Sequence, residues 1–153
     1  MEKKKTIYIS RSMLTDVKLV ENLAYQLKCL GFIVKYFKTG NYYSNKDVKE
    51  ADLVLVHPRV PYNGTVGKGQ FDEISLAMKL NIPAFFLETK INPRFAYQVY
   101  SDDLQIINST SWKEGYGSVD LNKQWEVSDI LNQIRNHSAI QAQEELLLIV
   151  DIK

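Results

Sequence analysis

Short apolar runs alternate with amphipathic segments along the first ninety residues of the chain. Four runs rich in β-branched and aromatic side chains predict strands: residues 6–10, 32–37, 53–56 and 84–87. Three segments between them predict helices, the longer two from apolar side chains at helical spacing: residues 16–30, 47–50 and 70–80. Asp16 is placed to cap the first helix, and Gly31 is placed to end it.

The second half of the chain has a less regular pattern. It predicts a short helix, a fifth strand, a turn-rich stretch and a further helix, at residues 94–99, 104–108, 109–119 and around 125–134. Residues 139–150 fit either one helix or a helix that passes into a strand, and the pattern leaves both open.

Alternating strands and helices predict a parallel sheet with right-handed crossovers. We expect an α/β fold, a three-layer sandwich with a flavodoxin-like parallel five-stranded sheet in the order 2-1-3-4-5, formed as a single domain by residues 1–153. In such a sheet, ligands bind at the carboxyl ends of the strands, near the switch between strands one and three.

Composition narrows the functional classes. The formal charge of +1 over 153 residues gives no reason to expect nucleic acid or an anionic membrane as a partner. No long apolar span or signal sequence is evident, which favours a cytoplasmic location. Cys29 is the only cysteine, and His57 and His137 stand apart in the sequence, so we expect neither a metal site nor a cofactor.

Residues 66–77 hold the strongest candidate chemistry. Gly67 and Gly69 predict a loop that can take positive φ and approach a ligand closely, and Asp72 and Glu73 follow in the expected first turn of a helix. Acids at a helix start are also explained by the helix dipole alone. The strand order nevertheless places this stretch at the predicted ligand edge.

Other polar residues are predicted at the same edge. Ser10 and Arg11 follow the first strand, and Arg59, Asn63 and Lys68 belong to the loop after the third. Arginine side chains and helix-start amides both bind phosphate. The three cations together suggest a phosphorylated ligand, a nucleotide in preference to a bare nucleoside.

An ordered set of short motifs resembles a known family. The motifs are Ile7-Tyr8-Ile9-Ser10, Ala51-Asp52 before an apolar strand, Gly69-x-x-x-Glu73-Ile74-x-x-Ala77, and Ile82-Pro83. Over about residues 6–90 the chain resembles the nucleoside 2-deoxyribosyltransferase-like superfamily. The resemblance implies cleavage of the N-glycosidic bond of a nucleoside or nucleotide, with Glu73 as nucleophile, Tyr8 beside it and Gly69 in the binding turn.

The chain departs from the family pattern at two places. Gly67 stands where the family has an aspartate that helps position or protonate the base, and Asn63-Gly64-Thr65 could replace that motif only with an amide. Asp72 is the other candidate for the missing acid. Ser10-Arg11 replaces a small Gly-Pro pair. The missing aspartate favours an alternative in which the chain binds a nucleotide without cleaving it.

Two further alternatives stay open. The chain also resembles Toll/interleukin-receptor-type domains, which share the strand order and a glutamate after the third strand, and whose catalytic members cleave NAD. A third possibility is an interaction protein that kept the fold and lost the pocket. The first resemblance implies a homo-oligomer, in which the apolar run 146–150 would suit an interface.

Overall fold

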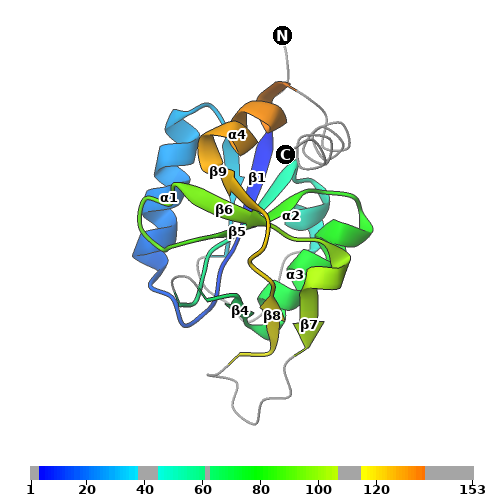
Figure 1. Cartoon of the computed structure of the whole chain (residues 1–153). Coiled ribbons are helices and arrows are strands. Elements are labelled where there is room, and N and C mark those ends of the chain that lie inside the picture. Colours follow the sequence, from blue (N-terminus) through cyan, green and yellow to red (C-terminus); the bar gives the residue numbers. More distant parts are fainter. Residues whose placement is uncertain (1–3, 38–44, 61–62, 107–114, 137–153) are drawn as a thin grey trace.

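The computed structural model describes residues 4–37, 45–60, 63–106 and 115–136. Within them a central six-stranded sheet has the order β2-β1-β3-β5-β6-β9 (Figure 1). Four neighbouring strands run parallel: β2 (Ile33–Lys35), β1 (Thr6–Ser10), β3 (Leu53–Val56) and β5 (Ala84–Leu87). The last two strands each run antiparallel to the strand before them: β6 (Phe95–Gln98) and β9 (Gln124–Glu126).

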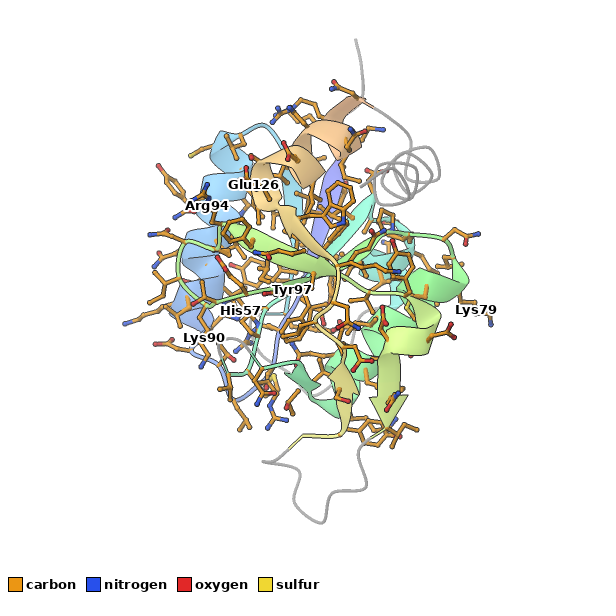
Figure 2. The ribbon with its side chains drawn as sticks, in the orientation of Figure 1. His57, Lys79, Lys90, Arg94, Tyr97 and Glu126 are labelled. Carbon is orange, nitrogen blue, oxygen red and sulfur yellow. The ribbon has the colours of Figure 1, made fainter. Side chains whose placement is uncertain are left out.

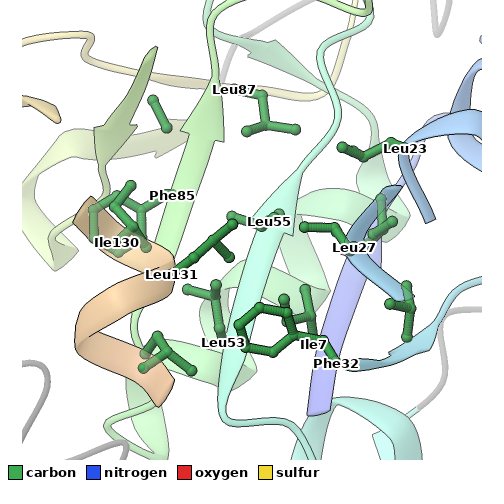
Figure 3. Close-up of a cluster of buried hydrophobic side chains, with 14 of the residues drawn as sticks. Ile7, Leu23, Leu27, Phe32, Leu53, Leu55, Phe85, Leu87, Ile130 and Leu131 are labelled. Carbon is green, nitrogen blue, oxygen red and sulfur yellow. The ribbon is translucent and has the colours of Figure 1, made fainter. Parts of the chain in front are cut away.

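Helices cover both faces of this sheet. On one face lie α1 (Val17–Cys29) and α4 (Val127–Asn136), whose Leu27 and Ile130 share an apolar cluster with Leu55 of β3 (Figure 3). On the other face lie α2 (Asn45–Lys49) and α3 (Lys68–Lys79), in a second apolar cluster. The prediction of an α/β fold is confirmed, and the sheet between the helical layers is mostly parallel.

The four parallel strands follow directly from the apolar runs. Every residue of β3 and β5 is buried, as expected for strands with both faces covered. The ends of α1 are also as predicted: the Asp16 carboxylate accepts a hydrogen bond from the Lys18 N–H at 3.0 Å, and Gly31 ends the helix with φ of +97°.

A second, smaller sheet lies beside the start of α3. Its three strands are antiparallel in the order β4-β8-β7: β4 (Thr65–Val66), β8 (Gly117–Val119) and β7 (Leu104–Ile106), the last preceded by the 3-10 helix η1 (Ser101–Asp103). Gly117 packs closely on α3, since a Cβ there would lie 2.5 Å from the Phe71 ring. This sheet was not expected from the sequence pattern.

Two predictions for the second half of the chain are wrong. Residues 104–106 form a strand, but it is an edge strand of the small sheet, with Ile106 64% exposed, and not a fifth parallel strand. Residues 95–98 form β6 instead of a helix, with burial that alternates along the strand. The predicted order 2-1-3-4-5 therefore holds for the first four strands only. Residues 139–150 lie outside the described ranges.

The helix α3 begins earlier than its glycines suggest. It starts at Lys68 with Gly67 as N-cap, so that its first turn contains no acidic residue. Asp72 and Glu73 consequently lie in the second turn. Because the field of a helix terminus falls off within one turn, the helix dipole does not explain these two acids.

Candidate active site

Glu73 is the centre of a buried polar cluster at the carboxyl end of β1. Its carboxylate accepts one hydrogen bond from the Tyr8 hydroxyl and another from the Ser10 hydroxyl, the latter with 2.7 Å between Oγ and Oε1. Glu73 is only 2% exposed, and both donors are buried. The structure thus brings together three of the residues that the sequence marked as candidates.

The alternation of β1 explains why two hydroxyls reach the same carboxylate. Ile7 and Ile9 belong to the apolar cluster on the α1 side of the sheet, whereas Tyr8 belongs to the cluster on the α3 side. Ser10, two residues beyond Tyr8, shares that second face. On α3, Glu73 shares the buried side of the helix with Ile74 and Ala77, so the carboxylate is built into an otherwise apolar contact.

Gln70 was missed by the sequence analysis and is a buried polar residue three positions before Glu73 on α3. Its side-chain amide donates to the Ser10 carbonyl oxygen at 3.2 Å and to the His57 carbonyl oxygen at 2.8 Å. The side-chain oxygen Oε1 of Gln70 accepts a hydrogen bond from the Gly67 N–H at 3.1 Å. The spacing of residues 70, 73, 74 and 77 could have indicated this position, since it places all four on one side of a helix.

The two candidate glycines do not use the conformations expected of them. Gly67 has φ of −77°, which any residue can adopt, and Gly69 lies within the helix. A Cβ at Gly69 would meet nothing within 4 Å. The expectation that these glycines take positive φ is therefore wrong, and Gly69 is exposed on the helix surface.

Gly69→Ala is expected to stabilise the free protein by about 0.5–1 kcal/mol, because alanine loses less conformational entropy than glycine in a helix. Urea unfolding of the two proteins measures this difference. If a ligand lies against the helix start, the same substitution weakens its binding, so the two effects have opposite signs. A destabilised Gly69→Ala protein would contradict the open environment of this residue.

Asp72 and Lys68 lie away from the Glu73 carboxylate. The Lys68 ammonium pairs with the Asp72 carboxylate at 3.2 Å, and it also lies 4.8 Å from the centre of the Tyr116 ring. That ring in turn contacts Phe71 edge-on, with 5.3 Å between ring centres. Asp72 thus has a surface ion pair one turn along the helix, a common arrangement of modest stability.

The other candidates of the predicted ligand edge have mainly backbone partners. Arg11 donates to the Phe37 carbonyl at 3.0 Å and to the Thr15 carbonyl at 2.9 Å, and so ties the loop after β1 to the segment after β2. The exposed Asn63 accepts a hydrogen bond from the Thr65 N–H at 2.9 Å, which shapes the turn before β4.

Arg59 is the most buried cation among these candidates. It follows β3, is 7% exposed, and lies next to Gly115, where a Cβ would come within 3.0 Å of its guanidinium. Burial lowers the pKa of this guanidinium, although arginine stays charged at any physiological pH. Gly115 has φ of +113°, so glycine is needed there both for conformation and for the close approach.

His57 lies directly beyond β3 and is fully buried. Its backbone N–H donates to the Ser10 carbonyl at 2.8 Å, which extends the pairing of β1 and β3. Its ring Nε2 is 3.2 Å from the Lys90 carbonyl oxygen, and Figure 2 shows both residues. Because a carbonyl only accepts, this contact places the proton of the neutral ring on Nε2.

Protonation of His57 is expected to destabilise the fold at acidic pH. Burial is the main cause that lowers its pKa from the usual 6.5. The hydrogen bond to the Lys90 carbonyl opposes this shift of the pKa, and the charges of Lys90 and Arg11 add to it. As the pH falls below about 6.5, the unfolded chain binds the proton first, so the stability that is complete above this pH declines. Unfolding free energies measured between pH 7.5 and pH 5 should show this slope.

His57→Gln should flatten that slope, and His137→Gln is the matched control for the other histidine. A slope that survives in His57→Gln and disappears in His137→Gln would contradict the assignment. The expected direction follows from linkage, because the state that binds more protons is favoured by acid.

No group of three His, Cys, Asp or Glu side chains among the described residues is arranged to hold a metal ion. None of the helices in the described part of the chain has the length and apolar character needed to cross a membrane.

Comparisons with known proteins show little similarity. No protein-family model and no curated protein matches the chain. Among solved structures, a ThuA-like protein from Bacteroides uniformis aligns with 56% of this chain and 36% of its own, at 16% sequence identity and a TM-score of 0.36. By its own fold and site, the molecule is a mixed α/β protein with a buried glutamate that accepts two hydrogen bonds at the carboxyl end of the first strand.

Proposed function

We propose that the chain binds a nucleotide or nucleoside at the carboxyl ends of β1 and β3, and that Glu73 cleaves or transfers at its N-glycosidic bond. The observation that carries this proposal is the Tyr8–Glu73–Ser10 cluster, in which two hydroxyls orient one carboxylate. The cluster lies at the carboxyl end of β1. The order of the parallel strands reverses between β1 and β3, and sheets of this kind bind ligands near that point. The motif resemblance over residues 6–90 supports the same assignment.

The chemistry needs a single carboxylate held in a fixed direction. Cleavage of the bond places positive charge on the anomeric carbon, and an oxygen of Glu73 forms a bond to that carbon as the bond to the base breaks. The base leaves with the bonding electrons and takes a proton from solvent. Water, or the nitrogen of a second base, then attacks the anomeric carbon and releases the Glu73 carboxylate. The two hydroxyls limit the rotation of the carboxylate, which lowers the cost of reaching this geometry.

Two cationic side chains near the start of α3 are candidates to bind a phosphate group of the ligand. Lys68 is the first residue of this helix, and Arg59 is buried in the loop that leads toward it. Helix-start amides and arginine both favour phosphate. Arg11 contributes less, because its guanidinium already bonds two carbonyls. We therefore propose a nucleotide as the preferred ligand. We further propose that the protein is cytoplasmic and, as the motif resemblance implies, a homo-oligomer.

Release of free base is the direct test. The protein is incubated with deoxynucleotides, ribonucleotides, their nucleosides and NAD, and the products are separated by chromatography. We expect base release from at least one nucleotide, and much less from Glu73→Gln. No release from any compound, or equal release by both proteins, would rule out the proposed activity. Release of nicotinamide alone would favour the Toll/interleukin-receptor-type alternative.

A second candidate function is nucleotide binding without cleavage. It is favoured by the burial of Glu73, which leaves 2% of the residue exposed, and by Gly67 at the position of the family aspartate. Calorimetry distinguishes the two functions, because this alternative predicts saturable heat of nucleotide binding with no base released. If no nucleotide gives heat of binding or a thermal shift, both functions are excluded.

A further inference from the structure

Gln70 is a buried carboxamide whose polar atoms are all used by backbone groups. Its Nε2 donates to the carbonyl oxygens of Ser10 and His57, at 3.2 and 2.8 Å, and its Oε1 accepts from the Gly67 N–H at 3.1 Å. The residue is 1% exposed. A buried amide with all of its groups satisfied is held in a single orientation, because a flip would set its oxygen against two carbonyls.

These three bonds join the structural elements that carry the site. Ser10 ends β1, His57 follows β3, and Gly67 is the N-cap of α3. The His57 N–H donates to the same Ser10 carbonyl at 2.8 Å. This carbonyl at the end of β1 therefore accepts hydrogen bonds both from the residue after β3 and from Gln70. Gln70 therefore spans the junction between the sheet and the helix.

The geometry at Glu73 depends on this junction. The hydroxyl donors Tyr8 and Ser10 belong to β1, whereas the carboxylate belongs to α3, one helical turn beyond Gln70. Any change in the separation of strand and helix changes the distance between these groups. Apolar contacts between the elements are not directional, but hydrogen bonds to three backbone groups are.

We infer that Gln70 is the positioning residue of the Glu73 site, which sets the carboxylate against the Tyr8 and Ser10 hydroxyls; the catalytic consequence of this inference rests on the proposed function. The two ends of the amide have separate tasks. The NH₂ group holds the ends of β1 and β3, and the oxygen caps α3 at Gly67.

Two substitutions separate these tasks. Gln70→Glu keeps an oxygen for the Gly67 N–H but places the other oxygen against the Ser10 and His57 carbonyls. Gln70→Met has a similar volume and offers no hydrogen bond to any of the three groups. The matched control is Gln26→Met, because the Gln26 amide lies on the surface of α1 and bonds only the Asn92 side chain at 2.9 Å among the contacts that the described residues show.

The positioning role is tested by NMR without any substrate. In the wild type, the Tyr8 hydroxyl proton should resonate downfield, as expected for a buried donor to a carboxylate, and Tyr8→Phe identifies the signal by its loss. Gln70→Glu should lose this signal and keep the slow exchange of the Gly67 amide. Gln70→Met should lose the signal and speed that exchange at least about tenfold. Gln26→Met should change neither.

Hydrogen exchange in the wild type tests the inference even if the Gln70 variants do not fold. The side-chain amide protons of Gln70 should exchange at least about a hundredfold more slowly than those of the exposed Gln105. Equal exchange rates would overturn the inference. So would a Tyr8 signal that is unchanged in Gln70→Glu, because Gln70 would then only cap the helix.

The kcat and KM of Gln70→Glu provide a further test. If Gln70 positions Glu73 without touching the ligand, Gln70→Glu should lower kcat by about 10- to 100-fold and leave KM within about twofold. A raised KM with unchanged kcat would overturn the inference, since it would place Gln70 in contact with the ligand. Absence of base release in the wild type would remove the proposed function alone, because the NMR results do not depend on it.

Discussion

Glu73→Gln is expected to lower kcat for base release by at least about a thousandfold while the protein stays folded. The amide has the size of the carboxylate, and its oxygen can still accept the hydrogen bond that Ser10 donates to Glu73. It cannot, however, form the bond to the anomeric carbon or balance the positive charge there. Chromatography of released base gives the rate, and urea unfolding gives the stability.

Asp72→Asn is the matched control for this substitution. Asp72 is the neighbouring acid on the same helix, and its carboxylate pairs with Lys68 at the surface. We expect its activity to stay within about twofold of the wild type, since exposed ion pairs of this kind contribute little. Tyr8→Phe should lie between the two, with about a 10- to 100-fold loss, because one of two orienting hydroxyls is removed. Comparable losses in Asp72→Asn and Glu73→Gln would contradict the assignment of the nucleophile.

Gly64→Ala is expected to destabilise the protein by about 2–3 kcal/mol, which is a large effect for a single methyl group. A Cβ at Gly64 would lie 2.0 Å from the Val119 carbonyl oxygen, and the Gly64 carbonyl accepts from the Val119 N–H at 2.8 Å. Because the obstacle is backbone, no side-chain rotation relieves the clash. β8, which contains Val119, would have to move away from the residues that precede β4.

Two other glycines are controls for this prediction. Gly31→Ala should cost about 1 kcal/mol, since φ is +97° there but a Cβ would meet nothing within 4 Å. Gly69→Ala should stabilise. The unfolding free energy should decrease in the order Gly69→Ala, Gly31→Ala, Gly64→Ala. A different order would show that the backbone φ and the space for a Cβ do not determine the effect of alanine at these positions.

The parallel half of the sheet could be predicted from local pattern, and its antiparallel edge could not. β3 and β5 are continuously apolar because both of their faces are covered, and this is visible in a window of four residues. β6 has a less distinctive sequence, Phe-Ala-Tyr-Gln, and besides β5 it pairs with β9 at residues 124–126. A pairing so distant in sequence leaves no trace in a local window, so the segment could equally be assigned to a helix.

The sequence predicted the hydrogen-bond acceptor and donors of the candidate site, but it did not predict Gln70, the residue that positions them. Tyr8, Ser10 and Glu73 were marked by strand ends and by motif spacing, and the structure brings them together. Helical spacing places Gln70 on the buried side of α3, but it does not indicate the hydrogen bonds that its side chain makes. Its role depends on α3 beginning at Lys68, which the two flanking glycines concealed, and on the positions of three backbone groups from distant segments.

Mass spectrometry of the acid-quenched protein tests the central claim most directly. The wild type is mixed with the nucleotide that releases its base fastest, quenched during turnover, and digested. If Glu73 is the nucleophile, a peptide that contains residue 73 gains the mass of the bound sugar phosphate, and Glu73→Gln gains none. Base release without an adduct on that peptide, or an adduct that persists in Glu73→Gln, would contradict the account.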